Sequence, residues 1–292
     1  MPELPEVETI KNDLKKKILA RKITDVIINK NKIIRNQSDD FIKVVKGDLF
    51  ESIDRVGKLL IFKLAKADKF MLVHLKMTGQ LIYRDKHKLI AGGHSLTGNN
   101  KIPGIGDRLP NKYTHVIFKL SGNGQLFFND LRQFGYLQIV DENELKKIKE
   151  NYGIEPLTAR FNLKNFQEVL KNRKVNIKAI LLNQKLIAGI GNIYADESLF
   201  RAGIRPSRQA KTLTRAEIRK LWQSISYIIG QAIKYRGTTF SNYVDSRGQA
   251  GNFAKLLKVY GRKGQKCYKC SGIVKKIKIA ARGTHYCPRC QK

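Results

Sequence analysis

The first twenty residues carry the hydrophobic spacing of a helix. Apolar side chains recur there at intervals of three and four positions, at Val7, Ile10, Leu14 and Ile18. This spacing places them on one face of an α-helix, because about 3.6 residues make one turn. We therefore predict an amphipathic helix that ends near Arg21 and buries its apolar face.

Beyond Ile23 the pattern changes to short apolar runs that are rich in β-branched and aromatic residues. Turn residues separate the runs, as at Gly122–Gly124. Such runs are typical of an antiparallel sandwich or barrel. The predicted strands are Ile23–Ile28, Leu59–Leu64, Phe70–Leu75, Leu81–Tyr83, His115–Leu120, Gln125–Phe128 and Tyr136–Val140. The segment Asp85–Lys112, which contains several glycines and prolines, is expected to form a long loop.

From about Asn162 onward the periodicity becomes helical. The predicted helices are Phe166–Lys171, Ile177–Leu182, Ile193–Ala202 and Ala216–Tyr235. The linker Gly153–Pro156 marks the boundary between the β-rich part and the helical part. We therefore expect an α+β multidomain protein, with domains at residues 1–150, 151–245 and 246–292.

The chain is strongly basic: it has 57 lysines and arginines against 24 acidic residues, a formal net charge of +33. That excess is far beyond what solubility needs, so a polyanionic partner is expected. No apolar run approaches the roughly 20 residues that span a bilayer, and the N-terminus lacks the order of a signal peptide. A basic amphipathic helix with a strong aromatic face is also missing. Nucleic acid is therefore the preferred partner, no membrane is expected, and a cytosolic location follows.

All four cysteines lie in the last 26 residues, as Cys267-x2-Cys270 and Cys287-x2-Cys290 with sixteen residues between the pairs. Each Cys-x-x-Cys can form a tight knuckle that presents two sulfur atoms to one tetrahedral ion. The spacer is long enough for a two-stranded hairpin. Four thiolates complete the coordination of Zn²⁺, so one structural zinc ion is predicted. Two disulfides are the alternative, which a reducing compartment disfavours.

The N-terminus, Met1-Pro2-Glu3, carries candidate chemistry. Removal of the initiator methionine before a small residue would leave Pro2 as a terminal secondary amine, with a pKa of about 8. Such an amine can add to an aldehydic carbon and form an iminium, and Glu3 could shuttle a proton. The alternative is an ordinary helix start, in which prolines and acidic residues suit the first turn. Taken alone, these residues favour the helix start.

Two further features suit the binding of phosphate groups. The turn Leu186–Asn192 joins two predicted helices, and Asn192 is placed to cap the second helix, whose exposed N–H groups could bind phosphate. After Asp245 the sequence contains no acidic residue. The cysteine-rich end is therefore a basic module that suits a phosphate backbone.

Several segments together match one known family: MPELPEVET at the N-terminus, Gly57–Phe62, His74–Leu81, Asp130–Gly135, Gly189–Ile204 and the cysteine-containing C-terminus. On these segments the chain closely resembles formamidopyrimidine-DNA glycosylases, bacterial enzymes that remove oxidised purines from DNA. The match covers essentially the whole length. It implies an N-terminal helix on a catalytic β-sandwich, a helix–two-turn–helix DNA-binding domain, and the remainder of a lesion-binding loop followed by a C-terminal zinc finger.

The resemblance implies a bifunctional glycosylase and abasic-site lyase that acts on a base flipped out of duplex DNA. Pro2 matches the nucleophile that attacks the sugar C1′ and forms an iminium, which enables strand cleavage by β- and δ-elimination. Glu3 matches the general acid/base. Lys58 matches a lysine assigned to proton donation and phosphate contact. Arg282 matches the zinc-finger arginine that grips phosphates beside the lesion and serves the later elimination.

The resemblance also implies a set of DNA contacts. Phe134 matches a wedge between base pairs, Met77 fills the space that the flipped base leaves, and Arg132 hydrogen-bonds the orphaned cytosine. Asn192 matches a residue that binds backbone phosphate, and Lys178 is expected to reach phosphate as well.

Thr238–Phe253 corresponds to the loop that closes over an everted oxopurine, with Thr238 as the expected base contact. Two positions depart from the family pattern. Tyr113 stands where a DNA-contacting histidine is common, and its phenol can still donate to phosphate. Arg173 replaces a common lysine and can bind phosphate bidentately.

Two other functions compete with this interpretation. The sister enzyme endonuclease VIII favours oxidised pyrimidines, but Leu4 and the set of Met77, Arg132 and Phe134 favour the purine enzyme. A non-catalytic zinc-ribbon DNA-binding protein would explain the charge and the cysteines, but not Pro2-Glu3. We therefore expect a monomeric enzyme that acts on double-stranded DNA containing 8-oxoguanine or formamidopyrimidines, and associates with the nucleoid through that binding.

Overall fold

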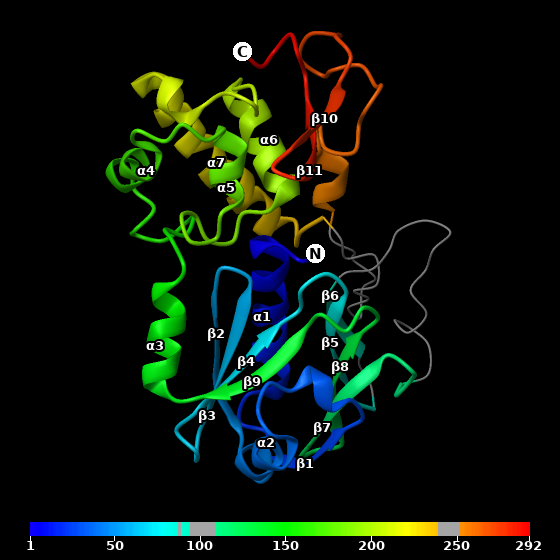
Figure 1. Ribbon diagram of the computed structural model, residues 1–292. Coiled ribbons are helices and arrows are strands. Elements are labelled where there is room, and N and C mark those ends of the chain that lie inside the picture. Colours follow the sequence, from blue (N-terminus) through cyan, green and yellow to red (C-terminus); the bar gives the residue numbers. More distant parts are fainter. Residues whose placement is uncertain (87–88, 94–108, 239–251) are drawn as a thin grey trace. The chain divides into compact units, whose positions relative to one another are not determined.

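The computed structural model describes residues 1–86, 89–93, 109–238 and 252–292, with only the backbone for 89–93 (Figure 1). The chain divides into two compact units. The first is Met1–Lys149 with Tyr235–Asn252, and the second is Glu150–Lys234 with Phe253–Lys292. Most of the predicted loop at 85–112, and residues 239–251 of the predicted lesion-binding loop Thr238–Phe253, lie outside the described residues.

Two antiparallel sheets form the first unit (Figure 1). The five-stranded sheet has the order β1 (Ile23–Ile28), β7 (Thr114–Leu120), β8 (Gly124–Asp130), β5 (Gly79–Arg84) and β6 (Leu89–Gly93). The four-stranded sheet has the order β2 (Phe50–Val56), β3 (Leu59–Leu64), β4 (Phe70–His74) and β9 (Tyr136–Val140). Buried side chains from both sheets, such as Phe62 and Phe128, share one core. The predicted antiparallel sandwich is confirmed.

Helix α1 (Leu4–Ile18) lies against both sheets. It contacts β2 at the edge of the four-stranded sheet and β6 at the edge of the five-stranded sheet. Covering these edges shields strands that would otherwise be open to pairing. Val7, Ile10 and Leu14 are buried in the shared core, as their spacing predicts. The N-terminus of the chain is thereby held at the start of a buried helix.

Several elements of the first unit have a weak hydrophobic pattern and were not predicted. Strand β2 lies at the edge of its sheet and carries the charged residues Glu51, Asp54 and Arg55, of which Glu51 and Asp54 are exposed. The helices α2 (Ser38–Val45) and α3 (Glu142–Glu150) are short, and α3 buries only Leu145. Strand β6 corrects the expectation of an unstructured loop over 85–112, since residues 89–93 pair with β5.

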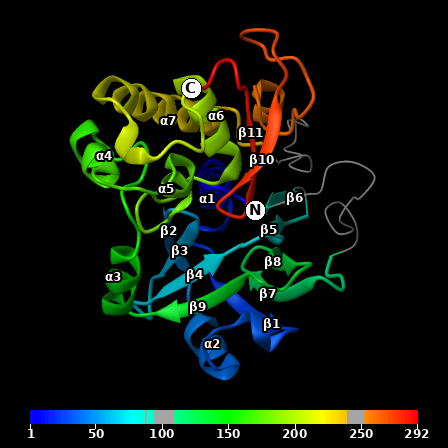
Figure 2. The same cartoon turned by 45° about the horizontal axis from the view of Figure 1, so that its top comes forward.

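The second unit contains four α-helices and a β-hairpin among its described residues. They are α4 (Leu163–Leu170), α5 (Ile177–Leu182), α6 (Asn192–Ala202), α7 (Arg215–Lys234), β10 (Lys275–Ile279) and β11 (Arg282–Tyr286). Asn162 and Asn176 cap α4 and α5 through their side chains. Gly191, and not Asn192 as expected, is the N-cap of α6. Strand β11 lies beside α6 (Figures 1 and 2).

Across the described ranges, no helix combines the length and the apolar character that a membrane crossing requires.

Candidate active site and nucleic-acid interface

Pro2 and Glu3 stand at the start of α1, and both are buried. Glu3 is the N-cap residue, and its carboxylate accepts the backbone N–H of Glu6. In return, Glu6 Oε2 accepts the Glu3 N–H at 2.9 Å. This reciprocal capping box fixes the backbone and the carboxylate of Glu3 together. The local geometry therefore holds a proton-transfer group one residue from the Pro2 nitrogen.

Glu6 also connects the helix start to a distant part of the chain. Its Oε1 accepts hydrogen bonds from the N–H of Thr238 at 2.9 Å and from the Thr238 hydroxyl at 3.1 Å. Gly237, at φ +82°, comes so close that a Cβ there would lie 2.6 Å from Glu6 Oε1. Thr238, the expected base contact, is thus buried and held beside the N-terminus. Sequence reasoning missed Glu6, although Glu3-x-x-Glu6 is a capping pattern.

Lys58 lies in the two-residue turn between β2 and β3 and is buried. The turn is braced from α1: Arg55 donates from Nη1 to the Gly57 carbonyl oxygen at 3.0 Å and from Nε to Glu8 at 2.8 Å. Gly57 has a φ of +55°, which favours glycine. The helix that begins at Glu3 therefore also positions the turn that carries Lys58.

His74, at the end of β4, is a functional candidate that the sequence reasoning did not single out. Burial, and then the positive charges of Lys76, Lys58 and Arg35, hold the pKa of His74 at about 3. Its Nδ1 accepts the backbone N–H of Lys76 at 3.0 Å, which places the ring proton on Nε2. His74 is therefore a neutral hydrogen-bond donor within a cationic cluster. The sequence signal that could have identified His74 is its position at the start of His74–Leu81, one of the segments that match the family.

The lowered pKa of His74 predicts a specific pH dependence of stability. The unfolded chain takes up a proton at His74 near pH 6.5, whereas the folded chain does so only near pH 3. The contribution of neutral His74 to the free energy of unfolding is therefore fully present above pH 6.5. As the pH falls below 6.5, this contribution is lost by up to about 1.4 kcal/mol per pH unit. We expect His74→Gln to weaken this acid sensitivity in denaturant unfolding at pH 7.5 and 5.5. An identical loss between these pH values in both proteins would contradict the assignment.

A buried carboxylate braces the segment that carries Arg132 and Phe134. Asp130 Oδ1 accepts from the Thr78 hydroxyl and, at 3.2 Å, from the Arg132 N–H, while Oδ2 accepts from the Gly135 N–H at 2.7 Å. Since Thr78 follows Met77, this network joins the two chain segments that carry the three predicted void-filling residues. Neither Thr78 nor Asp130 was predicted to have this role.

The side chains on this braced segment are presented to solvent. Phe134 is 55% exposed, and the Arg132 guanidinium carbon lies 4.8 Å from the centre of its ring. Met77 is half-buried. An exposed phenylalanine beside a guanidinium suits insertion into a base stack better than a role in the core.

Tyr113 precedes β7 and is half-buried. Its N–H donates to Asn111 Oδ1 at 2.9 Å, and its carbonyl oxygen accepts the Asp130 N–H at 3.0 Å. The Lys112 ammonium lies 5.2 Å from the centre of its ring. The tyrosine is therefore held near the same carboxylate brace, in a basic environment.

In the second unit, Lys178 has a different environment from the one expected. Its side chain is 0% exposed, and its Nζ bonds Asp196 Oδ1 at 2.6 Å and the Thr284 hydroxyl at 2.7 Å. The other carboxylate oxygen of Asp196 accepts the His285 N–H at 2.8 Å. The expectation that Lys178 reaches a DNA phosphate is corrected, because its ammonium group has no exposed surface. It instead ties α5 and α6 to β11.

Arg282 is exposed at the first position of β11. It follows a two-residue turn in which Ala280 and Ala281 have φ of 48° and 58°, the left-handed region that non-glycine residues rarely adopt. Asn192 Nδ2 donates to the Gly283 carbonyl oxygen at 3.0 Å, so α6 holds the strand directly after Arg282. Arg173 is also exposed and donates from Nε to the Val169 carbonyl oxygen at 2.6 Å.

Four sulfur atoms gather at the two knuckles that flank the hairpin. The Sγ atoms of Cys267, Cys270, Cys287 and Cys290 lie within 4.8 Å of one another, with Cys267–Cys290 at 3.9 Å and Cys270–Cys287 at 3.5 Å. Zn–S bonds of about 2.3 Å in a tetrahedron require S···S separations of about 3.8 Å. The four thiols therefore fit one structural zinc ion, and the predicted four-cysteine centre is confirmed.

Protein-family models match the chain in three successive parts. The formamidopyrimidine-DNA glycosylase N-terminal domain matches residues 1–137, the H2TH domain of that enzyme matches 152–244, and the zinc finger found in FPG and IleRS matches 264–292. The sandwich, the helices and the four-cysteine hairpin thus define a DNA glycosylase with a C-terminal zinc finger.

Similar proteins of known family show which kind of DNA glycosylase this chain is. The chain is 41% identical to the formamidopyrimidine-DNA glycosylase of Desulfitobacterium hafniense over 100% of both chains, and 42% identical to that of Carboxydothermus hydrogenoformans, again over 100% of both. The solved Lactococcus lactis Fpg in complex with abasic-site DNA is 33% identical, covers 99% of each chain and has a TM-score of 0.85. The chain belongs to the formamidopyrimidine-DNA glycosylase family.

Proposed function

We propose that this chain excises oxidised purines, such as 8-oxoguanine and formamidopyrimidines, from duplex DNA and then cleaves the strand at the abasic site. The observation that carries the proposal is the capped N-terminus, where Glu3 is fixed directly after Pro2. Membership of the family supports the substrate class. The L. lactis enzyme is solved with abasic-site DNA and, as a mutant, with DNA containing Fapy-dG. Reduced thiols and a DNA substrate suit a cytoplasmic enzyme.

In the proposed first step, the Pro2 nitrogen, freed by removal of Met1, forms a bond to C1′ of the flipped nucleotide. The bond between C1′ and the base breaks, and the base leaves with the electron pair and takes up a proton. Glu3 then protonates the sugar oxygen as the ring opens, which leaves an iminium between Pro2 and C1′. The capping box contributes by keeping the Glu3 carboxylate in place before the substrate arrives.

The iminium acidifies C2′, so loss of a proton there expels the 3′-phosphate, and a second elimination expels the 5′-phosphate. Both steps leave negative charge on phosphate groups, which cationic side chains stabilise. We assign this role to Lys58 and Arg282. We also assign His74 Nε2–H as a neutral phosphate donor, because Nδ1 is already bonded to Lys76. Water then hydrolyses the iminium and restores the Pro2 amine.

We further assign the DNA contacts by position. Phe134 and Arg132, exposed on the braced segment, enter the base stack, and Met77 fills the vacated space. Tyr113, Arg173 and Asn192 contact backbone phosphates. Thr238 contacts the everted base, with its own backbone held by Glu6.

Lys178 is assigned a positioning role, because its ammonium holds Asp196 and Thr284 next to the strand that begins with Arg282. Lys178→Met leaves the buried Asp196 carboxylate without this partner, so we expect a loss of stability of about 3–5 kcal/mol and weaker binding of DNA. Lys174→Met, which removes an exposed lysine nearby, is the matched control. Unchanged stability and DNA affinity in Lys178→Met would contradict this role.

Borohydride trapping tests the proposed reaction. The protein is incubated with a duplex that carries 8-oxoguanine opposite cytosine, and hydride reduces the iminium to a stable amine. A covalent protein–DNA adduct is expected, and Glu3→Gln should slow its formation by about 10²–10⁴-fold. No adduct from protein that begins with Pro2 would reject the catalytic function.

A parallel duplex containing thymine glycol separates the purine enzyme from an endonuclease VIII-like enzyme. The comparison is informative because L. lactis Fpg is also solved with DNA containing an oxidised pyrimidine. Faster excision of 8-oxoguanine is expected, whereas a strong preference for thymine glycol would overturn the assigned substrate class.

A further inference from the structure

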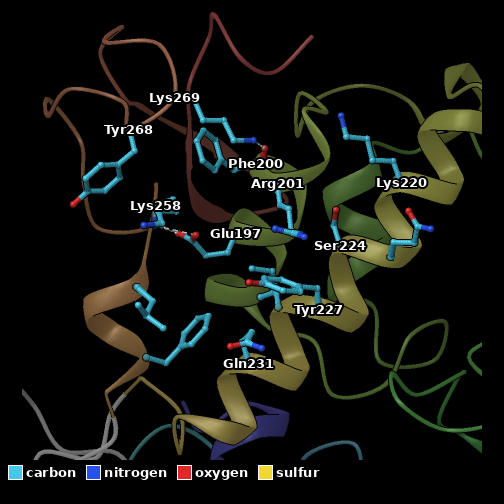
Figure 3. A pocket seen from close by; sticks show the side chains of 14 residues that line it. Glu197, Phe200, Arg201, Lys220, Ser224, Tyr227, Gln231, Lys258, Tyr268 and Lys269 are labelled. Atoms are coloured by element: carbon cyan, nitrogen blue, oxygen red, sulfur yellow. Dashed lines mark hydrogen bonds between the residues drawn. The ribbon is translucent and has the colours of Figure 1, made fainter.

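A hollow of about 750 Å³ lies within the second unit, between α6, α7 and the segment from η3 (Phe253–Leu256) to the first zinc knuckle (Figure 3). Its walls expose large apolar surfaces. Tyr227 on α7 is 48% exposed and Tyr268 in the knuckle is 64% exposed, and Leu256 also faces the hollow. Apolar groups that are left open in one concave place are typical of a binding site.

Four cations surround this apolar surface: Arg201, Lys220, Lys258 and Lys269, all exposed. The Arg201 guanidinium carbon lies 3.6 Å from the centre of the Tyr227 ring, and the Lys258 ammonium lies 4.6 Å from that of Tyr268. Within the described residues, none of the four forms a salt bridge with a carboxylate. The positive charge of the hollow is therefore available to a ligand.

Glu197 is the one acidic side chain among the described residues that line the hollow. It is buried, and its carboxylate accepts the backbone N–H groups of Lys258, Val259 and Tyr260 at 2.9–3.0 Å. Its oxygens are thus committed to holding the wall of the hollow, as Figure 3 shows for Lys258. Its one carboxylate is outnumbered by the four cations of the rim, so the site suits an anionic partner.

The hollow is separated along α6 from Asn192, which we assign to DNA within this unit. Asn192 begins α6 and contacts Gly283 beside Arg282, whereas Arg201 stands nine positions later on the same helix. At about 1.5 Å per residue, the two positions are about 14 Å apart along the helix axis. The proposed reaction therefore leaves the charge and the shape of the hollow unexplained.

We propose that this hollow docks an acidic segment of a partner protein, with one large apolar side chain inserted between Tyr227 and Leu256 and with carboxylates bound to the cationic rim. Charge complementarity favours an acidic partner. A nucleic acid is less suited, because stacked bases need open aromatic faces. The chain's own guanidinium groups already cover rings here, Arg201 on Tyr227 at 3.6 Å and Arg262 on Tyr268 at 3.8 Å.

The test uses the full-length, zinc-loaded protein and a fluorescein-labelled heptapeptide, Gly-Asp-Glu-Asp-Phe-Asp-Glu, read by fluorescence anisotropy. Two matched peptides replace the Phe by Ser, or every acidic residue by its amide. Each replacement is expected to weaken binding at least fivefold. Arg201→Glu and Tyr227→Ala should each weaken binding of the parent peptide at least tenfold. Lys164→Glu, an exposed charge reversal on α4, makes the same change of net charge as Arg201→Glu and should have less than a twofold effect.

Excision of 8-oxoguanine and binding of a labelled twelve-nucleotide oligothymidine are measured on the same proteins. Both are expected to remain within twofold of the parent in Arg201→Glu and Tyr227→Ala. Three results would overturn the proposal: equal binding of the three peptides, equal loss in the Lys164→Glu control, or loss of oligothymidine or duplex DNA binding that matches the loss of peptide binding. The last result would assign the hollow to nucleic acid.

Discussion

Protein that retains a residue in front of Pro2 is expected to lose base excision and strand cleavage by at least about 10⁴-fold, with its affinity for lesion-containing DNA nearly unchanged. The Pro2 nitrogen is then part of a peptide bond, whose lone pair is delocalised into the carbonyl group and cannot attack C1′. An uncleaved N-terminal tag produces this state. Single-turnover excision of 8-oxoguanine measures the chemistry, and anisotropy measures the binding.

The control for this experiment is the same tag at the C-terminus, which should leave the rate unchanged. Pro2→Gly is a second control, because a terminal glycine still offers a primary amine and should retain part of the activity. Equal excision by the N-terminally blocked protein, with its intact tag verified by mass, would show that the nucleophile is elsewhere.

Loss of zinc is expected to have the largest effect on stability. The core around the knuckles is small and includes two of the ligands, Cys267 and Cys287, beside Phe200, Val259 and Val274. So small a core cannot hold the hairpin alone, and structural zinc typically contributes on the order of 10 kcal/mol. Chelation, or Cys287→Ser, should therefore unfold β10–β11 and release Arg282.

The expected readout of zinc loss is weaker binding of DNA, with a smaller dependence on salt. Each lost phosphate contact should reduce the slope of log affinity against log salt by about 0.9. Restoring Zn²⁺ after chelation should restore both quantities in the parent but not in Cys287→Ser. Unchanged affinity and salt dependence after verified removal of the metal would contradict the role of the zinc hairpin.

The sequence predicted the elements whose hydrophobic pattern is strong. Strand β3, strand β9 and helix α5 begin and end where their patterns indicated. Helix α3 was missed because its side chains are largely exposed and charged, so burial leaves little periodic signal. Strand β2 was missed because the charged residues Glu51, Asp54 and Arg55 interrupt its apolar run. Strand β6 was missed because a loop was expected wherever glycines gather.

The residues of the candidate site also differ in how far the sequence predicts them. The cysteine pairs are a local pattern, so their metal chemistry could be inferred from the spacing of neighbouring residues alone. Pro2-Glu3 alone favoured an ordinary helix start, and its catalytic role was predicted only from the family resemblance. The groups that hold them act over long sequence separations: Thr238 bonds Glu6, and Thr78 bonds Asp130. The expected role of Lys178 was wrong for the same reason. Its positive charge suggested a contact with a DNA phosphate, and only the fold shows that its ammonium group bonds Asp196.

Mass spectrometry of the borohydride-trapped adduct identifies the nucleophilic atom, which we assign as the Pro2 nitrogen. The adduct is digested with protease and nuclease, and the modified peptide is sequenced by fragmentation. We expect one modified peptide that begins at Pro2, lacks Met1 and carries the sugar remnant on its terminal nitrogen. A remnant on the side chain of Lys58, or on any other lysine with Pro2 unmodified, would contradict it.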